Sequence, residues 1–268
     1  MPEIFNPQKS KQRCKNYRKK ILEISQRVTA LHIAPAFSCL EIIDVIYHDL
    51  MDDHLTDTFV LSKGHGCMAQ YVILHDLGVL TDEDLEKYCT PEGRLGGHPD
   101  YGIPGIAAST GSLGHGLGMA VGMCYGDRLE KKTHKTYVVI SDGELQEGST
   151  WEAILVAANL KLSNLIVFVD LNNQISTGKL SVDYPAIYPL NDKLRAFGWN
   201  VSEVNGHDAS ALYQAGKITS DHQPTFVIAH TQKGKGVSYM EDVSMWHYRS
   251  PNPAEYQQAM KELDEVSS

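Results

Sequence analysis

Short apolar runs recur along the chain and alternate with longer stretches of helical periodicity. Five of these runs have the length and composition of strands: Thr58–Leu61, Tyr137–Ile140, Leu165–Asp170, Trp199–Val204 and Pro224–Ala229. The third begins Leu-Ile-Val-Phe-Val, which is apolar at every position, as is typical of a parallel strand covered on both faces. Strands that alternate with helices predict an α/β fold, a doubly wound parallel sheet with helices on both faces.

The clearest helix prediction follows the second run. We expect Ser149 to cap this helix, because Glu152 three residues later completes a capping-box pattern. A stripe with the i, i+3, i+4, i+7 spacing is expected to face the core and consists of Trp151, Ile154, Leu155 and Ala158. No internal repeat or linker interrupts the pattern, so residues 1–268 are expected to form a single domain.

Composition narrows the classes of function. The chain has 268 residues, of which 42% are hydrophobic and 21% charged, enough to bury a full core. A net charge of −9 argues against a nucleic-acid surface, because binding to a phosphate backbone requires a clustered basic face. The seven basic residues between Lys9 and Lys20 are therefore interpreted as a solvated helix face.

The remaining composition features predict a cytoplasmic protein with no membrane segment. No stretch approaches the length and apolarity of a membrane span, and no signal peptide is visible. The five cysteines are odd in number, widely spaced and without a Cys-x-x-Cys pair. We expect them to be reduced thiols.

Polar residues suited to a metal follow two of the predicted strands. Asp142 and Asn172, thirty residues apart, each come one or two positions after a buried strand. Ligands of an open parallel sheet bind beyond these carboxyl ends. The two side chains and the carbonyl of Gln174 offer the oxygen ligands that Mg²⁺ prefers, while Gly143 allows a phosphate to approach the backbone. The expected ligand is a metal-bound diphosphate.

The residues around this pair carry a family resemblance. The segments Ser141–Gly148 (SDGELQEG) and Val169–Gln174 (VDLNNQ) resemble the thiamine diphosphate binding motif of the transketolase family, with Ser141 in place of its first glycine. Four further segments look like transketolase sequences in the family's order: FVLSKGHG (Phe59–Gly66), GGHPD (Gly96–Asp100), STGSLGHGLGMAVG (Ser109–Gly122) and KGKGVSYM (Lys233–Met240). The chain is similar to the amino-terminal half of a split transketolase.

The resemblance implies roles for individual residues. The metal, Mg²⁺ or in its place Ca²⁺ or Mn²⁺, would be bound by Asp142, Asn172 and Gln174. Contacts with thiamine diphosphate would come from His65, Gly111, Ser112, Leu113, Asp142, Gly143, Glu144, Asn172 and His247. The residues implied to act on the substrate or at the subunit interface are His32, His98, Glu147 and His247. Leu31 and Ile33 flank His32 where the family usually has glycine and proline, so the loop geometry there is expected to differ.

The resemblance also implies a partner. In the family, the glutamate that activates the cofactor's aminopyrimidine lies on the following domain, and this chain ends before that domain begins. We therefore expect a carboxy-terminal, pyrimidine-binding chain, an α2β2 assembly, and transfer of a two-carbon ketol unit from a ketose or ketose phosphate to an aldose.

Other functions stay open at this point. One is a thiamine diphosphate enzyme that decarboxylates a 2-oxoacid, and another is a degenerate regulatory subunit. A dinucleotide fingerprint at Gly111–Gly118 is disfavoured, because the glycine spacing does not fit and no clean strand precedes it. The KGKG stretch lacks the Ser or Thr of a Walker loop and is interpreted as a flexible turn near the active site.

Overall fold

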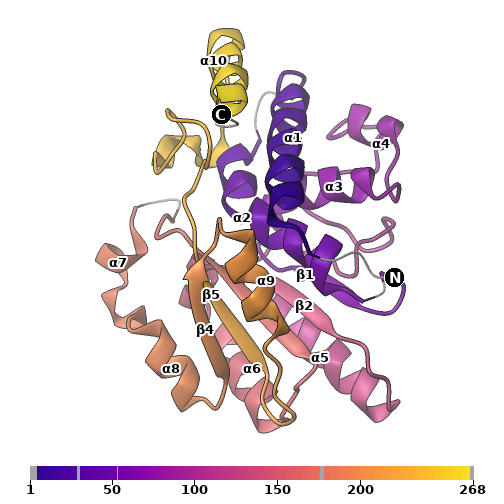
Figure 1. Ribbon diagram of the computed structural model, residues 1–268, viewed down its shortest axis with the longest axis vertical. Helices are drawn as coiled ribbons and strands as arrows, with labels where there is room; N and C mark the ends of the chain where they lie inside the picture. The colour runs from indigo at the N-terminus through magenta and orange to yellow at the C-terminus, as the bar shows by residue number, and fades with distance from the viewer. Residues whose placement is uncertain (1–4, 29–30, 53, 176–177, 266–268) are drawn as a thin grey trace.

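A computed structural model describes residues 5–28, 31–52, 54–175 and 178–265. Its sheet has five strands, all parallel, in the order β1-β2-β3-β5-β4 (Figure 1). Their bounds are β1 Thr58–Leu61, β2 Thr136–Ser141, β3 Leu165–Leu171, β4 Asn200–Asn205 and β5 Thr225–His230. Each predicted strand is confirmed to within one residue at either end.

Helices cover both faces of this sheet, as predicted (Figure 1). The core on one face includes residues of α1 Pro7–Ser25, α2 Ile33–Val45, α3 Cys67–Asp76, α9 Ala209–Lys217 and α10 Pro253–Glu265. Within it α2 and α9 contact the strands, whereas α10 packs against α1. The other face packs against α5 Gly116–Leu129, α6 Gly148–Asn159, α7 Leu180–Asp183 and α8 Leu190–Ala196. The short α4, Asp82–Glu86, follows α3 and adds Leu85 to the first core.

Alternation along the strands explains why there are two cores. Ile166 and Phe168 of β3 belong to the core beneath α1, α2 and α9, whereas Val167 and Val169 belong to the core beneath α5, α6 and α8. Successive side chains of a strand point to opposite faces, so a strand buried on both sides must be apolar at every position. The unbroken apolar run of β3 thus reflects its central place in the sheet.

Helix α6 differs from the prediction in its N-cap residue and in part of its buried face. The residue before it is Glu147, and Ser149 lies inside the first turn, where its Oγ donates to the Gly114 carbonyl at 2.9 Å. The buried face consists of Thr150, Ala153, Ile154 and Ala157. Leu155, predicted to face the core, is 55% exposed. The other three predicted residues do meet the core, since Ile154 is fully buried and Trp151 and Ala158 pack against it, so the predicted face was wrong at Leu155. The small residues Ala153 and Ala157, which carry a weak hydrophobic signal, complete the buried face.

The glycine-rich and proline-rich loop before α5 is held in place by hydrogen bonds. Tyr71 Oη donates to the carbonyls of Gly96 and His98 at 3.2 and 2.9 Å, and Thr110 Oγ1 donates to the Leu61 carbonyl at 2.7 Å. The loop is therefore tied to α3 and to the end of β1, next to the carboxyl edge of the sheet. Among the described residues, no helix is both long enough and apolar enough to span a bilayer.

Candidate active site

A cavity of about 300 Å³ lies at the carboxyl edge of the sheet. Residues that follow the ends of four strands line it: Lys63 and His65 after β1, Asp142 and Gly143 after β2, Asn172 and Gln174 after β3, and Lys233 after β5. Its other lining residues are His32, Pro35, His98, Gly111, Leu113, Ser141, Gln146, Glu147, Ile175 and His247. Parallel strands bring all of these carboxyl ends to one edge, so residues far apart in sequence share one cavity.

Asp142 is a buried carboxylate on the cavity wall. Its Oδ2 accepts from the Asn173 amide at 2.6 Å and its Oδ1 from the Gly143 amide at 2.9 Å. Burial, reinforced by the nearby charge of Asp170, raises the pKa of Asp142 to about 7. Removing a carboxylate from water disfavours its charged form unless a cation compensates. The environment of Asp142 therefore suits a bound divalent metal.

Asn172 and Gln174 complete the set of oxygen donors beside Asp142. The Asn172 Oδ1 accepts from the Gln174 amide at 2.9 Å, and its Nδ2 donates to Ser38 Oγ at 3.0 Å. Among the described residues, no group of three or more His, Cys, Asp or Glu is arranged to hold a metal. Such a donor set, with one carboxylate, fits a hard cation that takes its remaining ligands from water and phosphate.

Gly143 lies between these donors and has room for a side chain within the fold. A Cβ added there would meet Ile175 Cγ2 and Ser141 Oγ at 3.7 Å, an ordinary contact distance. The protein's own packing therefore does not require glycine at this position. The bare backbone on the cavity wall is consistent with the close approach of a phosphate.

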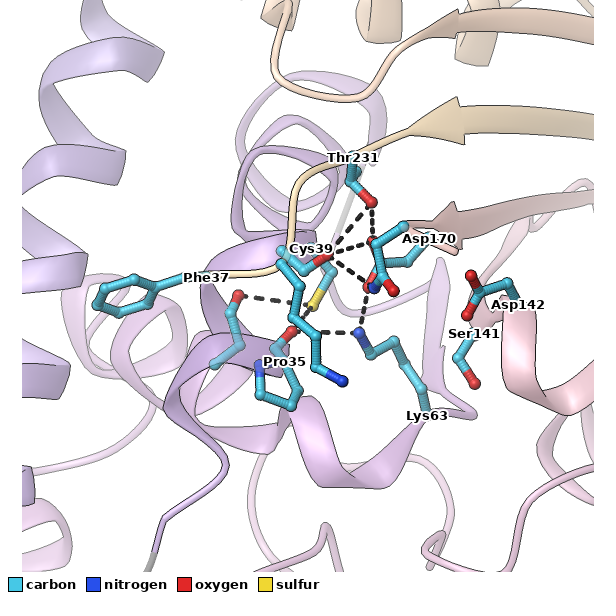
Figure 2. A network of polar contacts seen from close by, with 12 residues as sticks. Pro35, Phe37, Cys39, Lys63, Ser141, Asp142, Asp170 and Thr231 are labelled. Carbon is cyan, nitrogen blue, oxygen red and sulfur yellow. Dashed lines mark hydrogen bonds and ion pairs between the residues drawn. The ribbon is translucent and has the colours of Figure 1, made fainter. Parts of the chain in front are cut away.

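Lys63 is held under the cavity by a network centred on Asp170 (Figure 2). The buried Asp170 pairs with Lys63 and accepts from the hydroxyls of Ser38, at 2.7 Å, and Thr231. Burial would lower the pKa of Lys63, but Asp170 raises it above its usual value. The Lys63 ammonium stays charged, and it also donates to the Pro35 carbonyl at 3.1 Å.

Lys233 is the second buried cation of the cavity, and unlike Lys63 it has no carboxylate as a direct partner among the described residues. Its Nζ lies 2.7 Å from His247 Nδ1 and 3.5 Å from the Gln174 carbonyl. Burial, together with the charge of Lys63, lowers its pKa to about 8. The sequence interpretation missed both lysines, although each follows a strand end just as Asp142 does. The KGKG stretch is indeed a turn, with positive φ at Gly234 and Gly236, and Lys233 is the residue it presents to the cavity.

Four predicted histidines gather in the cavity, with His32 at their centre. Its ring centroid lies 5.6 Å from that of His65, 6.0 Å from that of His98 and 5.3 Å from that of His247. These residues come from the start of α2, the end of β1, the glycine-rich loop and the turn before α10. His247 thus lies inside the cluster with the other three.

Three of these histidines are neutral at physiological pH. Burial, with His98 and the two lysines adding to it, lowers the pKa of His32 to about 4. Burial and Lys233 lower the pKa of His247 to about 3, and burial and Lys63 lower that of His65 well below its usual value. A neutral imidazole has one donor and one acceptor nitrogen, so these rings can bind hydroxyl groups in either sense.

Not every predicted residue reaches the cavity. Gly111 and Leu113 line it, but Ser112 between them does not. Glu144 is fully buried outside it, where its carboxylate accepts from the Ser141 amide at 2.9 Å and the Gly114 amide at 3.0 Å. The structure gives Glu144 the role of holding the glycine-rich loop against the end of β2. Glu147, by contrast, is exposed on the cavity rim.

Comparison with known proteins identifies the family of the chain. The family described as "Transketolase, thiamine diphosphate binding domain" matches residues 32–263. The chain is 35% identical to one subunit of the apulose-4-phosphate transketolase of Phocaeicola vulgatus, over 92% of this chain and 91% of that protein. It is 34% identical to the protein of the same name from Actinobacillus succinogenes, over 94% of each.

Solved structures show the same fold. The transketolase of Campylobacter jejuni superposes with a TM-score of 0.90 at 26% identity, covering 97% of this chain and 43% of that one. The chain thus spans less than half the length of that transketolase. The matching family, the similarity to two transketolase subunits and the shared fold lead to one conclusion: this chain belongs to the transketolase family, as its thiamine diphosphate binding domain.

Proposed function

We propose that residues 1–268 form a single domain that binds the diphosphate end of thiamine diphosphate with a divalent metal, Mg²⁺ or its substitutes Ca²⁺ and Mn²⁺. One observation carries the proposal: three oxygen donors, two buried lysines and four histidines from separate segments line the same cavity. The donors at Asp142, Asn172 and the Gln174 carbonyl would hold the metal. The ammonium groups of Lys63 and Lys233 would face the negative charge of the diphosphate.

The reaction we propose is transfer of a two-carbon ketol unit from a ketose or ketose phosphate to an aldose. When bound, thiamine diphosphate supplies the carbanion that attacks the ketose carbonyl. The chain's own residues bind and orient: His32, His65, His98 and His247 would exchange hydrogen bonds with substrate hydroxyls and the developing oxyanion. Gly111 and Leu113 would form a wall beside the cofactor's rings.

We further propose that the active site is completed by a second, pyrimidine-binding chain in an α2β2 assembly in the cytoplasm. Two relatives that are themselves named as transketolase subunits match this chain nearly end to end and support this arrangement. Exposed Glu147 on the cavity rim is placed to meet such a partner. The partner would supply the glutamate that activates the aminopyrimidine.

The test is an assay of the chain alone and co-purified with a pyrimidine-binding chain encoded beside it. Both preparations receive thiamine diphosphate, Mg²⁺, a ketose phosphate donor and an aldose acceptor. The proposal predicts two-carbon transfer by the complex only. Full turnover by the isolated chain would contradict the need for a partner, and a cofactor-loaded complex that transfers no ketol unit from any ketose would contradict the reaction.

The alternative of a 2-oxoacid decarboxylase is tested in the same preparation. Release of carbon dioxide from pyruvate or a longer 2-oxoacid would favour it. The neutral rings of His32 and His247 favour a polyhydroxylated donor instead, because each ring offers a hydroxyl group both a donor and an acceptor.

A further inference from the structure

A second cavity of about 300 Å³ lies apart from the active site, beside α1. One of its walls is a face of α1 whose residues follow the i, i+3, i+4, i+7 spacing and consist of Gln8, Lys11, Gln12, Lys15 and Arg18. The three basic residues belong to the segment that composition alone suggested was a solvated face. Lys11 and Lys15 are four residues apart, a spacing at which like charges destabilise a helix.

The opposite wall joins α2, the turn after β4, the turn after β5 and the end of α10. It consists of Glu41, His207, Lys235, Gly236 and Leu263. Four basic side chains therefore surround a cavity whose lining contains one carboxylate, on a chain with a net charge of −9. Of the basic groups, Lys15 is 3.3 Å from Asp264 and Lys235 is 3.6 Å from Glu241, whereas Lys11 has no ion pair among the described residues.

The single carboxylate is already fully engaged. Arg18 donates from Nη1 to Glu41 Oε1 at 2.6 Å and from Nη2 to Oε2 at 2.9 Å. The backbone amide of Gln232 donates to His207 Nε2 at 2.8 Å, so the proton of the neutral His207 ring is on Nδ1. His207 Nδ1 then donates to Glu41 Oε2 at 2.9 Å. Glu41 thus has little capacity left to balance the charges of Lys11, Lys15 and Lys235.

Arg18 itself retains a donor. The side chain is only 7% exposed, and its Nε is buried with no hydrogen-bond partner among the described residues. Because Nε has almost no accessible surface, a ligand in the cavity does not reach it. The donors that line the cavity are the amides of Gln8 and Gln12 and the ammonium groups of Lys11, Lys15 and Lys235, and these match the acceptor oxygens of a phosphate group.

We propose that this cavity binds a small phosphate monoester, at a site separate from the one that holds the cofactor. The lysines and the glutamine amides would bind the phosphate oxygens, Arg18 would add positive charge behind them, and Leu263 would contact the organic part of the ligand. The turn after β5 serves both cavities, since Lys233 lines the active site and Lys235 and Gly236 line this one. The inference does not depend on which reaction the active site carries out.

The test is a titration of the full chain with inorganic phosphate and with glycerol 3-phosphate, followed residue by residue by amide NMR. A site-resolved measurement is needed because phosphate can also enter the active-site cavity. We expect saturable shifts at Lys11, Gln12, Lys235 and Gly236 with either probe. Shifts confined to residues of the active site, or none at all, would overturn the proposal.

A pair of variants with equal charge change provides the control. The first double variant carries Lys11→Gln and Lys235→Gln and loses two cations that line the cavity. The second carries Lys20→Gln and Lys261→Gln and loses two cations that do not line it. We expect the first pair to raise the dissociation constant about tenfold, because two charge-assisted hydrogen bonds are lost. The second pair should leave it within about twofold of the wild-type value. Equal dissociation constants for the two double variants would overturn the proposal.

Discussion

The Nζ of Lys233 lies 2.7 Å from Nδ1 of His247. An ammonium group only donates, so Nδ1 must accept and the neutral His247 ring carries its proton on Nε2. The contact therefore selects the tautomer of a histidine in the active-site cavity. Burial is the main reason that the pKa of each group is lowered; the charge of Lys63 adds to this for Lys233, and the charge of Lys233 adds to it for His247.

Replacing Lys233 with methionine should raise the pKa of His247. The charge of Lys233 is, after burial, the main cause of the low His247 pKa. We therefore expect the pKa of His247 to rise by about one unit, equivalent to ~1.4 kcal/mol, when this charge is removed. An NMR titration of the His247 ring measures the pKa. Lys235→Met is the matched control, because Lys235 lines the other cavity. An unchanged His247 pKa in Lys233→Met would contradict the assigned contact.

Replacing Asp170 with asparagine should destabilise the fold strongly. The change leaves the buried Lys63 ammonium without its counter-charge, at a cost of about 3–5 kcal/mol in the free energy of unfolding. Urea denaturation measures this loss. Asp52→Asn, which breaks an exposed pair with Lys135, should cost less than about 1 kcal/mol. Similar losses for the two variants would show that the network in Figure 2 does not hold Lys63 in its charged form.

Stabilisation by Mg²⁺ should depend on pH through Asp142. Its pKa rises from 3.8 to about 7 on folding, so the metal-free folded chain binds this proton more tightly than the unfolded chain does. The contribution of Asp142 to stability is therefore present below about pH 4 and is lost as the pH rises to about 7. Under the proposed function Mg²⁺ would bind the ionised carboxylate, so the increase in melting temperature with Mg²⁺ should grow through this window.

The control for this prediction is Asp142→Asn, which keeps the shape of the side chain and removes its charge. In that variant the Mg²⁺-dependent increase should be small and independent of pH. A wild-type increase that is the same at pH 5 and pH 8 would argue against Asp142 as the metal ligand.

Replacing Gly111 with alanine should strain the loop that carries the cavity wall. Gly111 has φ of +144°, and a Cβ there would lie 3.1 Å from the ring of His98. We expect a loss of about 1–3 kcal/mol in the free energy of unfolding, together with displacement of His98. Gly118→Ala, on the exposed face of α5 with no neighbour within 4 Å of the new Cβ, should not destabilise the chain. Chemical denaturation measures the loss of stability in each variant, and the NMR signal of His98 reports whether its ring is displaced. Equal stability of the Gly111→Ala and Gly118→Ala variants would contradict this prediction.

The sequence predicted the sheet well because the hydrophobic pattern of buried strands is easy to recognise. Strands buried on both faces must be apolar throughout, and the central parts of β2 and β3 satisfy this requirement, with polar residues only toward their ends. The placement of Asp142 and Asn172 followed from the same argument, since both come just after a strand.

Other features needed the tertiary structure. Nothing local in the sequence indicated that Lys63 and Lys233, which follow β1 and β5, would be buried beside the same cavity. Helix α6 buries Ala153 and leaves Leu155 exposed, because the close approach of the helix to the sheet selects small side chains. Glu144 and Ser112 lie within matching motifs but do not line the cavity, and motif position alone cannot show this.

The most direct test of the account is a calorimetric titration of thiamine diphosphate into the assembled complex, with and without Mg²⁺, for the wild type and for Asp142→Ala. The account predicts tight, Mg²⁺-dependent binding by the wild type and a loss of affinity of about a hundredfold or more in the variant, because a ligand of the metal is removed. An Asp142→Ala complex that binds the cofactor with unchanged affinity and unchanged Mg²⁺ dependence would contradict it.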